Sequence, residues 1–185
     1  MKINTSEVCD VVVDLETLGR RAGCPILEIG AAATLGDGTI VTFQAFPHLQ
    51  PQLEVRKPDA ATILWWMGDA QTPARQALLA KVGPEGESAQ PVELALDGFS
   101  KFVNEASYGR DLRIWGNSAR FDLGILEELY RLWARDLPWQ FWQERDLRTA
   151  FDGNKPNVTF NGIKHVGRDD AAHELRQLLW LERAQ

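Results

Sequence analysis

The chain has 185 residues, of which 44% are hydrophobic and 25% are charged. These proportions suit one ordinary globular domain, which we expect to span residues 1–185, and they exclude a fibrous repeat and a low-complexity disordered chain. Acidic residues outnumber basic residues by 26 to 20, giving a formal charge of −6. This charge argues against a protein that coats nucleic acid through a basic surface. It is compatible with a protein whose acids are clustered to hold cations.

The first part of the chain predicts three strands. Residues 8–13 are almost all apolar and β-branched, as in a strand that is covered on both faces. Two further strand-like runs, residues 26–35 and 39–46, flank the Gly-Asp-Gly sequence of residues 36–38, which is typical of a hairpin turn.

Helices are expected in much of the remaining chain. Asp59 can cap a short helix, and Thr72 with Pro73 can begin another. The pattern also predicts a surface loop over residues 83–91, a strand over 112–115, and helices over 92–104, 121–134 and 169–181. Three strands followed by helices, another strand and further helices are typical of an α/β domain with a mixed sheet.

Cysteine content and apolar runs restrict the class of protein further. Cys9 and Cys24 are too few for a disulfide framework or a four-cysteine zinc site, so we expect a reducing compartment. Asp10 and Asp14 interrupt the only apolar run near the start, and no other segment approaches the ~20 apolar residues of a membrane helix. We therefore expect a soluble, cytoplasmic protein with no membrane partner.

The first candidate functional residues lie where the first strand ends. Asp14 and Glu16 are two residues apart, so in extended backbone their side chains project from the same face. In open α/β sheets this end of a central strand is where sites form. A strand that runs out into solvated polar residues also explains the pair.

Asp122 is a carboxylate on an apolar stripe. Counting back from Trp133 through Leu129 and Leu126 at helical spacing places it on the side that faces the core. A carboxylate there is costly unless it is paired or bound to a metal. A helix cap or a buried ion pair with a residue such as Arg120 is the alternative.

The last candidates lie near the C-terminus. His165 is in a polar loop, and Asp169 or Asp170 lies in the first turn of the final helix, where an acid commonly satisfies the helix dipole. Four acids and one histidine at the ends of separate elements nevertheless provide ligands for two divalent ions and a general base. The oxygen ligands favour Mg²⁺ or Mn²⁺, and the lack of a cysteine cluster or an H-E-x-x-H helix argues against zinc.

Three motifs in this order resemble those of the DEDDh 3′→5′ exonucleases of the ribonuclease H-like fold. The first is VDLETLG at residues 13–19, which carries Asp14 and Glu16. The second is IWGNSARFDLGILEELY at residues 114–130, with Asp122 as the third acid. The third is HVGRDDAAHEL at residues 165–175, whose H-x4-D spacing selects Asp170.

Two further segments are similar to one branch of that family. They are PDAATILWWM at residues 58–67 and PWQFWQERDLRT at residues 138–149. The branch contains ribonuclease T-like exoribonucleases and phage exonuclease VIII-like enzymes. The resemblance therefore covers nearly the whole chain.

The resemblance implies a fold and a reaction. The fold is a five-stranded mixed sheet flanked by helices. The reaction is metal-dependent hydrolysis of phosphodiester bonds from the 3′ end of single-stranded DNA or RNA, releasing nucleoside 5′-monophosphates. Two Mg²⁺ or Mn²⁺ ions are expected, with Asp14 as the bridging ligand, Glu16 and Asp170 on the first ion, and Asp122 on the second. His165 would take the proton from the attacking water.

Contacts to the terminal nucleotide are expected next to the acids. Thr17 and Leu18 follow the first motif's acids and can offer backbone groups to the sugar, and in similar enzymes the position of Leu18 lies against the terminal base. Asn117 is expected to orient the loop before Asp122. Similar exonucleases are often homodimers, so a homodimer is one arrangement that the resemblance implies, and the sequence leaves the oligomeric state open.

Trp65 and Trp66 are two candidates for stacking on a base. They are adjacent on a short helix, so they point roughly 100° apart, and only one can easily join Ile63 and Met67 in the core. Aromatic stacking holds a base without reading its identity. Packing of both rings explains the pair equally well.

Two other functions fit parts of this pattern. A ribonuclease H-type endonuclease would use comparable acids, but the H-x4-D ending and the lack of a broad basic surface count against it. A non-catalytic nucleic-acid-binding module would tolerate the loss of one of the four motif acids. All four are present, which favours the enzyme. The nearest candidates for a local basic surface are Arg20 and Arg21, directly after the first motif.

Overall fold

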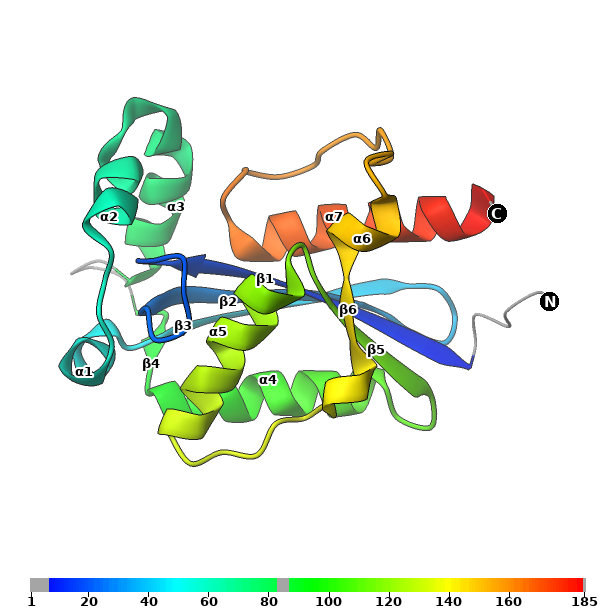
Figure 1. The fold of residues 1–185 in the computed structure, drawn as a ribbon, viewed down its shortest axis with the longest axis horizontal. Coiled ribbons are helices and arrows are strands. Elements are labelled where there is room, and N and C mark those ends of the chain that lie inside the picture. Colours follow the sequence, from blue (N-terminus) through cyan, green and yellow to red (C-terminus); the bar gives the residue numbers. More distant parts are fainter. Residues whose placement is uncertain (1–6, 83–86, 185) are drawn as a thin grey trace.

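A mixed sheet organises the part of the chain that the computed structural model describes, residues 7–82 and 87–184. Its strand order is β4-β3-β2-β1-β5-β6 (Figure 1). β1 (Val8–Thr17) is central, antiparallel to β2 (Ile26–Thr34) and parallel to β5 (Asp111–Gly116). β2 continues into the antiparallel β3 (Ile40–Pro47), which confirms the expected hairpin. The α/β class with a mixed sheet is likewise confirmed.

The sheet has six strands where five are expected. β4 (Ala89–Gln90) pairs with β3, and β6 (Glu144–Asp146), which follows the helical turn η2 (Phe141–Gln143), pairs with β5. Strands of two and three residues are too short to show an alternating pattern, so periodicity does not predict them. The expected loop over residues 83–91 therefore contains a strand, while residues 83–86 lie outside the described residues.

Helices cover both faces of the sheet. Figure 1 shows α4 and α7 on opposite sides of it. One face packs against α4 (Val92–Ala106) and α5 (Ala119–Leu132), and the other packs against α6 (Leu147–Phe151) and α7 (Gly167–Ala184). None of the described helices is long and apolar enough to cross a membrane.

Alternation along β1 separates the two cores. Val11, Val13 and Leu15 belong to the core on the α4 and α5 side, whereas Val12 belongs to the core on the α7 side. Side chains two residues apart share a face. The two acids that follow Val12 at this spacing therefore face α7.

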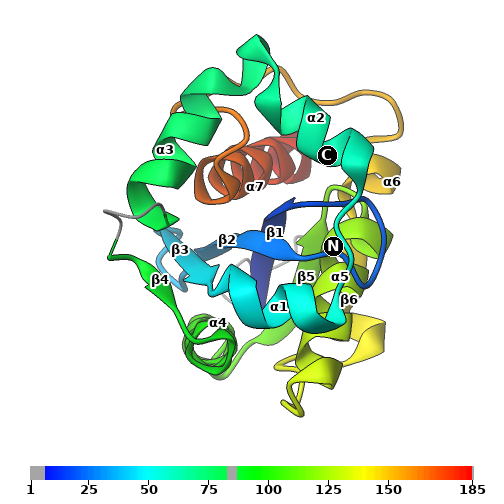
Figure 2. The same cartoon turned by 90° about the vertical axis from the view of Figure 1, so that its left-hand side faces the viewer.

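A helical segment lies at one end of the sheet. It consists of α1 (Leu49–Val55), α2 (Ala60–Met67), the turn η1 (Asp69–Gln71) and α3 (Thr72–Val82). Figure 2 shows α2 and α3 on the side of α7 and α1 on the other side, toward α4. Asp59 caps α2 as expected, accepting the backbone N–H of Ala61 at 2.9 Å. Of the two tryptophans only Trp66 is buried, which confirms that one ring packs. Ile63 and Met67, expected beside it in the core, are exposed instead because α2 turns that side to solvent.

Close backbone packing fixes the start of α7 against the sheet. Gly30 on β2 is the register partner of Asp14. A Cβ atom at Gly30 would lie 2.0 Å from the carbonyl carbon of Gly167 and 2.3 Å from the backbone nitrogen of Arg168. Only glycine at this position lets the first turn of α7 reach the middle of the sheet.

We expect Gly30→Ala to destabilise the protein by about 3 kcal/mol or more, which is the upper end of the usual cost of overpacking. The cost is high because the added methyl group clashes with backbone atoms, and no change of rotamer relieves that clash. Chemical denaturation measures the loss. Gly36→Ala is the control, since a Cβ at this turn meets nothing within 4 Å. Equal stability of the two variants would contradict the close packing of α7.

Candidate functional site

Two acids lie inside β1 and not beyond its end. The strand expected over residues 8–13 continues to Thr17, so Asp14 and Glu16 are paired with Gly30 and Glu28 of β2. Pairing with β2 extends the strand past its apolar run. Glu16 is 7% exposed. The alternative that these acids are solvated residues after a strand is therefore wrong.

Asp122 lies in the first turn of α5 and is 2% exposed, as its place on the apolar stripe predicts. Its carboxylate accepts the backbone N–H of Leu15 at 3.2 Å and that of Ser118 at 3.5 Å. No salt bridge to Arg120 forms among the described residues. β1 and β5 are parallel, so their C-terminal ends coincide, and the bond to Leu15 ties Asp122 to the acids of β1.

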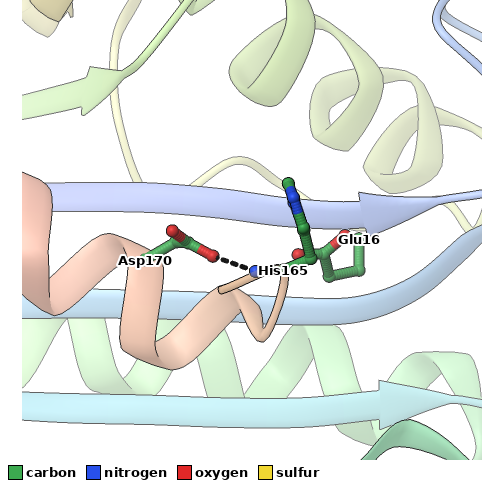
Figure 3. A group of neighbouring side chains, drawn as sticks. All are labelled: Glu16, His165 and Asp170. Carbon is green, nitrogen blue, oxygen red and sulfur yellow. Dashed lines mark hydrogen bonds between the residues drawn. The ribbon is translucent and has the colours of Figure 1, made fainter. Parts of the chain in front are cut away.

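The third segment is the loop before α7 with the first turn of that helix. The backbone N–H of His165 donates to the Asp170 carboxylate at 2.6 Å, and His165 has a left-handed backbone, with φ of 63°. One ligand atom from each of Glu16, His165 and Asp170 lies within 4.8 Å of the others (Figure 3). Asp169 instead accepts the backbone N–H of Ile163 and the guanidinium of Arg168. The structure thus distinguishes the two neighbouring acids and brings Asp170 to Glu16.

Two further buried acids belong to this cluster and are not predicted from the sequence. Glu174 is 4% exposed and accepts a hydrogen bond from Asn117, while its Oε2 has no partner in the described part of the chain. Glu28 is 2% exposed and accepts from the Gln44 side chain and from the backbone of Arg168.

Sequence signals for both acids exist. Glu174 is four residues after Asp170, so the two share a helix face. Glu28 is two residues before Gly30 in β2 and thus shares the face on which Asp14 and Glu16 lie.

The carboxylates of this cluster oppose one another's ionisation. Burial, with the charges of Asp122 and Glu16, raises the pKa of Asp14 well above its usual range. Burial, with the charge of Glu28, does the same to the pKa of Glu16. Burial raises the pKa of Asp122 to about 7, against hydrogen bonds that lower it, and raises that of Glu174 to about 8 with help from Asp122. The pKa of Asp170 is also raised by burial.

This donor set fits a divalent cation. Among the described residues, no salt bridge joins Asp14, Glu16, Asp122 or Glu174 to a basic side chain. Carboxylate oxygens are the ligands that Mg²⁺ and Mn²⁺ prefer. A cation would satisfy the unpartnered Glu174 oxygen or its neighbours and would favour the charged form of the acids.

The residues expected to contact substrate differ in whether their side chains remain exposed. Trp66 is 6% exposed and donates its Nε1–H to the carbonyl of Thr17 at 2.9 Å, so it packs α2 onto β1 and has no free ring face. Trp65 is 42% exposed and contacts the His165 ring edge to face, with ring centroids 4.9 Å apart. Asn117 holds Glu174.

Leu18 and Thr17 are placed at the end of β1. The Leu18 backbone N–H donates to the carbonyl of Pro25 at 2.9 Å, so that donor is already used. The half-buried Leu18 side chain packs against the cluster of Leu27 and Trp66. Thr17 is 5% exposed, and its hydroxyl donates to the carbonyl of Gly19 at 2.6 Å. The Leu18 side chain is therefore the part of this pair that keeps some exposed surface.

Comparison with known protein families gives one match over most of the chain. Residues 9–180 match the family described as the 3′-5′ exoribonuclease Rv2179c-like domain. The match includes all three motifs identified above. Among curated proteins, none matches this sequence.

Several solved structures similar to this chain are nucleases. The nuclease domain of 3′hExo, a DEDDh family member bound to rAMP, is 12% identical with a TM-score of 0.62, and the alignment covers 95% of this chain and 92% of that one. Cell-death related nuclease 4 is 12% identical, with a TM-score of 0.58 over 95% of this chain and 64% of its own.

A third similar structure is a complex with a single strand. It is the zinc-bound form of Escherichia coli ExoI with ssDNA, which is 16% identical with a TM-score of 0.58. The alignment covers 97% of this chain and 41% of ExoI, so the chain spans less than half of that protein's length. At these identities the structures show a shared fold.

Proposed function

Because this chain belongs to the 3′-5′ exoribonuclease Rv2179c-like family and is therefore a 3′-5′ exonuclease, we propose that it removes nucleoside 5′-monophosphates one at a time from single-stranded nucleic acid. The observation that carries this proposal is the meeting of buried acids from β1, α5 and α7, which have no salt bridge to a basic side chain among the described residues. A structural ion-pair network would contain the balancing cations within the protein. An acid cluster that lacks them suits metal ions and the phosphate they attract.

The acids are proposed to hold two divalent ions, Mg²⁺ or Mn²⁺. Asp14 would bridge them, Glu16 and Asp170 would hold one, and Asp122 would support the other. Bound there, such ions supply a nucleophile at neutral pH and stabilise the charge on the leaving oxygen. The Leu15 and Ser118 backbone N–H groups keep the Asp122 carboxylate aimed at the end of β1.

His165 is proposed as the general base. Its loop places it within reach of Glu16 and Asp170, and its left-handed backbone is held by the hydrogen bond from its N–H to Asp170. The exposed imidazole takes the proton of the attacking water and passes it to solvent. Trp65, which rests against this imidazole, is proposed to line the place of the terminal base together with Leu18.

We expect His165→Ala to lower kcat by about 10²-fold or more at neutral pH, which is the usual contribution of a general base. KM should change much less, because His165 is not proposed to bind the strand. Steady-state kinetics on a labelled oligonucleotide measures both constants. Full activity of the variant at neutral pH would show that another group accepts the proton.

One assay tests the proposed function against its alternatives. A 5′-labelled single strand, as DNA and as RNA, is incubated with Mg²⁺ or Mn²⁺, with EDTA, and with an Asp14→Asn control. A descending ladder that requires metal and Asp14 is the expected result, and the two sugars compared side by side give the preference. Scattered internal cuts would indicate an endonuclease, and retention without cleavage would indicate a binding module. The cytoplasmic location and the homodimer remain predictions.

A further inference from the structure

A surface hollow is lined by the turn after β1 and by the exposed side of α5. Its volume is about 820 Å³, and four arginines with two glutamates contribute to its lining: Arg20, Arg21, Arg120, Arg131, Glu127 and Glu128. We refer to it as the arginine hollow. Its four guanidinium groups and two carboxylates leave it positive in a chain whose formal charge is −6.

The pairing within the hollow leaves three arginines available. Arg131 is held by Glu128 through two hydrogen bonds of 2.8 and 2.7 Å. Arg20 comes only within 3.8 Å of Asp59, with its side chain 75% exposed. In the described part of the chain, the exposed side chains of Arg21 and Arg120 have no hydrogen bond or salt bridge. Three guanidinium groups therefore face solvent against one unpaired carboxylate, that of Glu127.

The walls of the hollow continue the segments that carry the acids. Arg20 and Arg21 lie in the turn that begins at Leu18, directly after β1 ends at Thr17. Arg120 is in the first turn of α5, two residues before Asp122, and the positive end of the helix dipole adds to its charge. Arg120 is exposed and Asp122 is buried, on opposite sides of α5, so the hollow adjoins the acids through the turn of Arg20 and Arg21 and not across the helix. A strand whose terminal nucleotide lies against Leu18 can reach this turn with the phosphates that precede that nucleotide. Arginine presents a planar fork of donors that matches phosphate oxygens.

We propose that the arginine hollow binds the phosphates of the strand that precede the terminal nucleotide, an inference that rests on the proposed exonuclease function. It supplies positive charge that the chain as a whole lacks. The proposal also predicts that the affinity of the protein for single strands increases with strand length, because a mononucleotide reaches the acids without filling the hollow. Contacts to phosphates hold the strand without reading its bases.

The test compares Arg21→Gln/Arg120→Gln with Arg183→Gln, which removes an exposed charge at the far end of α7. Each is combined with Asp14→Asn, so that a fluorescent single-stranded dodecamer is bound without being cut. Each phosphate contact on a single strand contributes about 0.7 to the slope of log affinity against log salt. The double variant should therefore lose about 1.4 from this slope and bind the dodecamer at least about tenfold more weakly. Arg21→Lys/Arg120→Lys should recover the slope.

A ligand without a strand completes the design. A nucleoside 5′-monophosphate, which reaches the acids without filling the hollow, should bind the double variant and the Arg183→Gln control with similar affinity. A slope equal to that of the control, or an equal loss of affinity for dodecamer and mononucleotide, would overturn the proposal. Because every variant also carries Asp14→Asn, the slope of log affinity against log salt is measured without catalysis. It therefore tests the arginine hollow even if the ladder assay shows no exonuclease activity.

Discussion

Replacing Asp14 with asparagine is expected to abolish exonuclease activity and, at the same time, to raise the melting temperature of the metal-free protein at pH 8. Loss of groups that only support metal ligands costs about 10- to 100-fold, so loss of the proposed bridging ligand should exceed about 100-fold in kcat/KM. The stability gain follows from the pKa of Asp14, which burial and the neighbouring carboxylates raise well above its usual range. Asparagine is neutral without binding a proton, so it avoids the free-energy cost of protonating or charging this buried carboxyl at pH 8.

Asp10→Asn is the matched control because Asp10 lies four residues earlier on the same face of β1. It is also buried, but it has partners: Arg113 donates to it at 2.7 and 2.6 Å, and Trp115 donates at 2.7 Å. This variant should lose stability and keep its activity. Thermal denaturation in EDTA and single-turnover kinetics measure the two effects. If Asp14→Asn lowered the melting temperature as Asp10→Asn does, Asp14 would be a structural residue.

The second large effect is the response of the metal-free protein to pH. The carboxyl groups of Asp122 and Glu174 titrate at about 7 and 8 in the folded chain and near 4 in an unfolded one. Between these values the folded state binds more protons than the unfolded state, so its stability falls as the pH rises. At about 1.4 kcal/mol for each pKa unit, the two groups together predict a loss of several kcal/mol between pH 4 and 8.

Divalent metal should reverse this trend. Mn²⁺ or Mg²⁺ stabilises the ionised carboxylates, so the rise in melting temperature on adding metal should be larger at pH 8 than at pH 5. Melting curves in EDTA and in each metal at both pH values test this. Asp14→Asn should reduce the metal effect at pH 8, while Asp10→Asn should retain it. Equal metal effects at both pH values would contradict a cluster of protonated acids.

Apolar patterns in the sequence predict the larger elements of this fold. The β-branched run of residues 8–13 and the hairpin at residues 36–38 place the central strands, and the helical stripe through Leu126 and Leu129 places Asp122 on the buried side of α5. Each of these depends on local alternation or helical periodicity. β4 and β6 depend on pairing with neighbours, which local pattern does not encode.

The site is predictable where a residue's neighbours in sequence constrain it. Asp170 is distinguished from Asp169 only by the H-x4-D spacing of the family that the third motif resembles, and the structure brings it to Glu16. Glu28 joins the cluster only because β2 pairs in one register with β1. The burial of Trp66 and the exposure of Trp65 depend on how α2 docks on Thr17, so adjacency alone leaves the choice open.

Anomalous diffraction from crystals grown with Mn²⁺ tests the central claim most directly. The account predicts manganese peaks among the carboxylates of Asp14, Glu16, Asp122 and Asp170, and the loss of these peaks in Asp14→Asn crystals. Manganese bound only elsewhere, with the four carboxylates left protonated and in contact with one another, would contradict it.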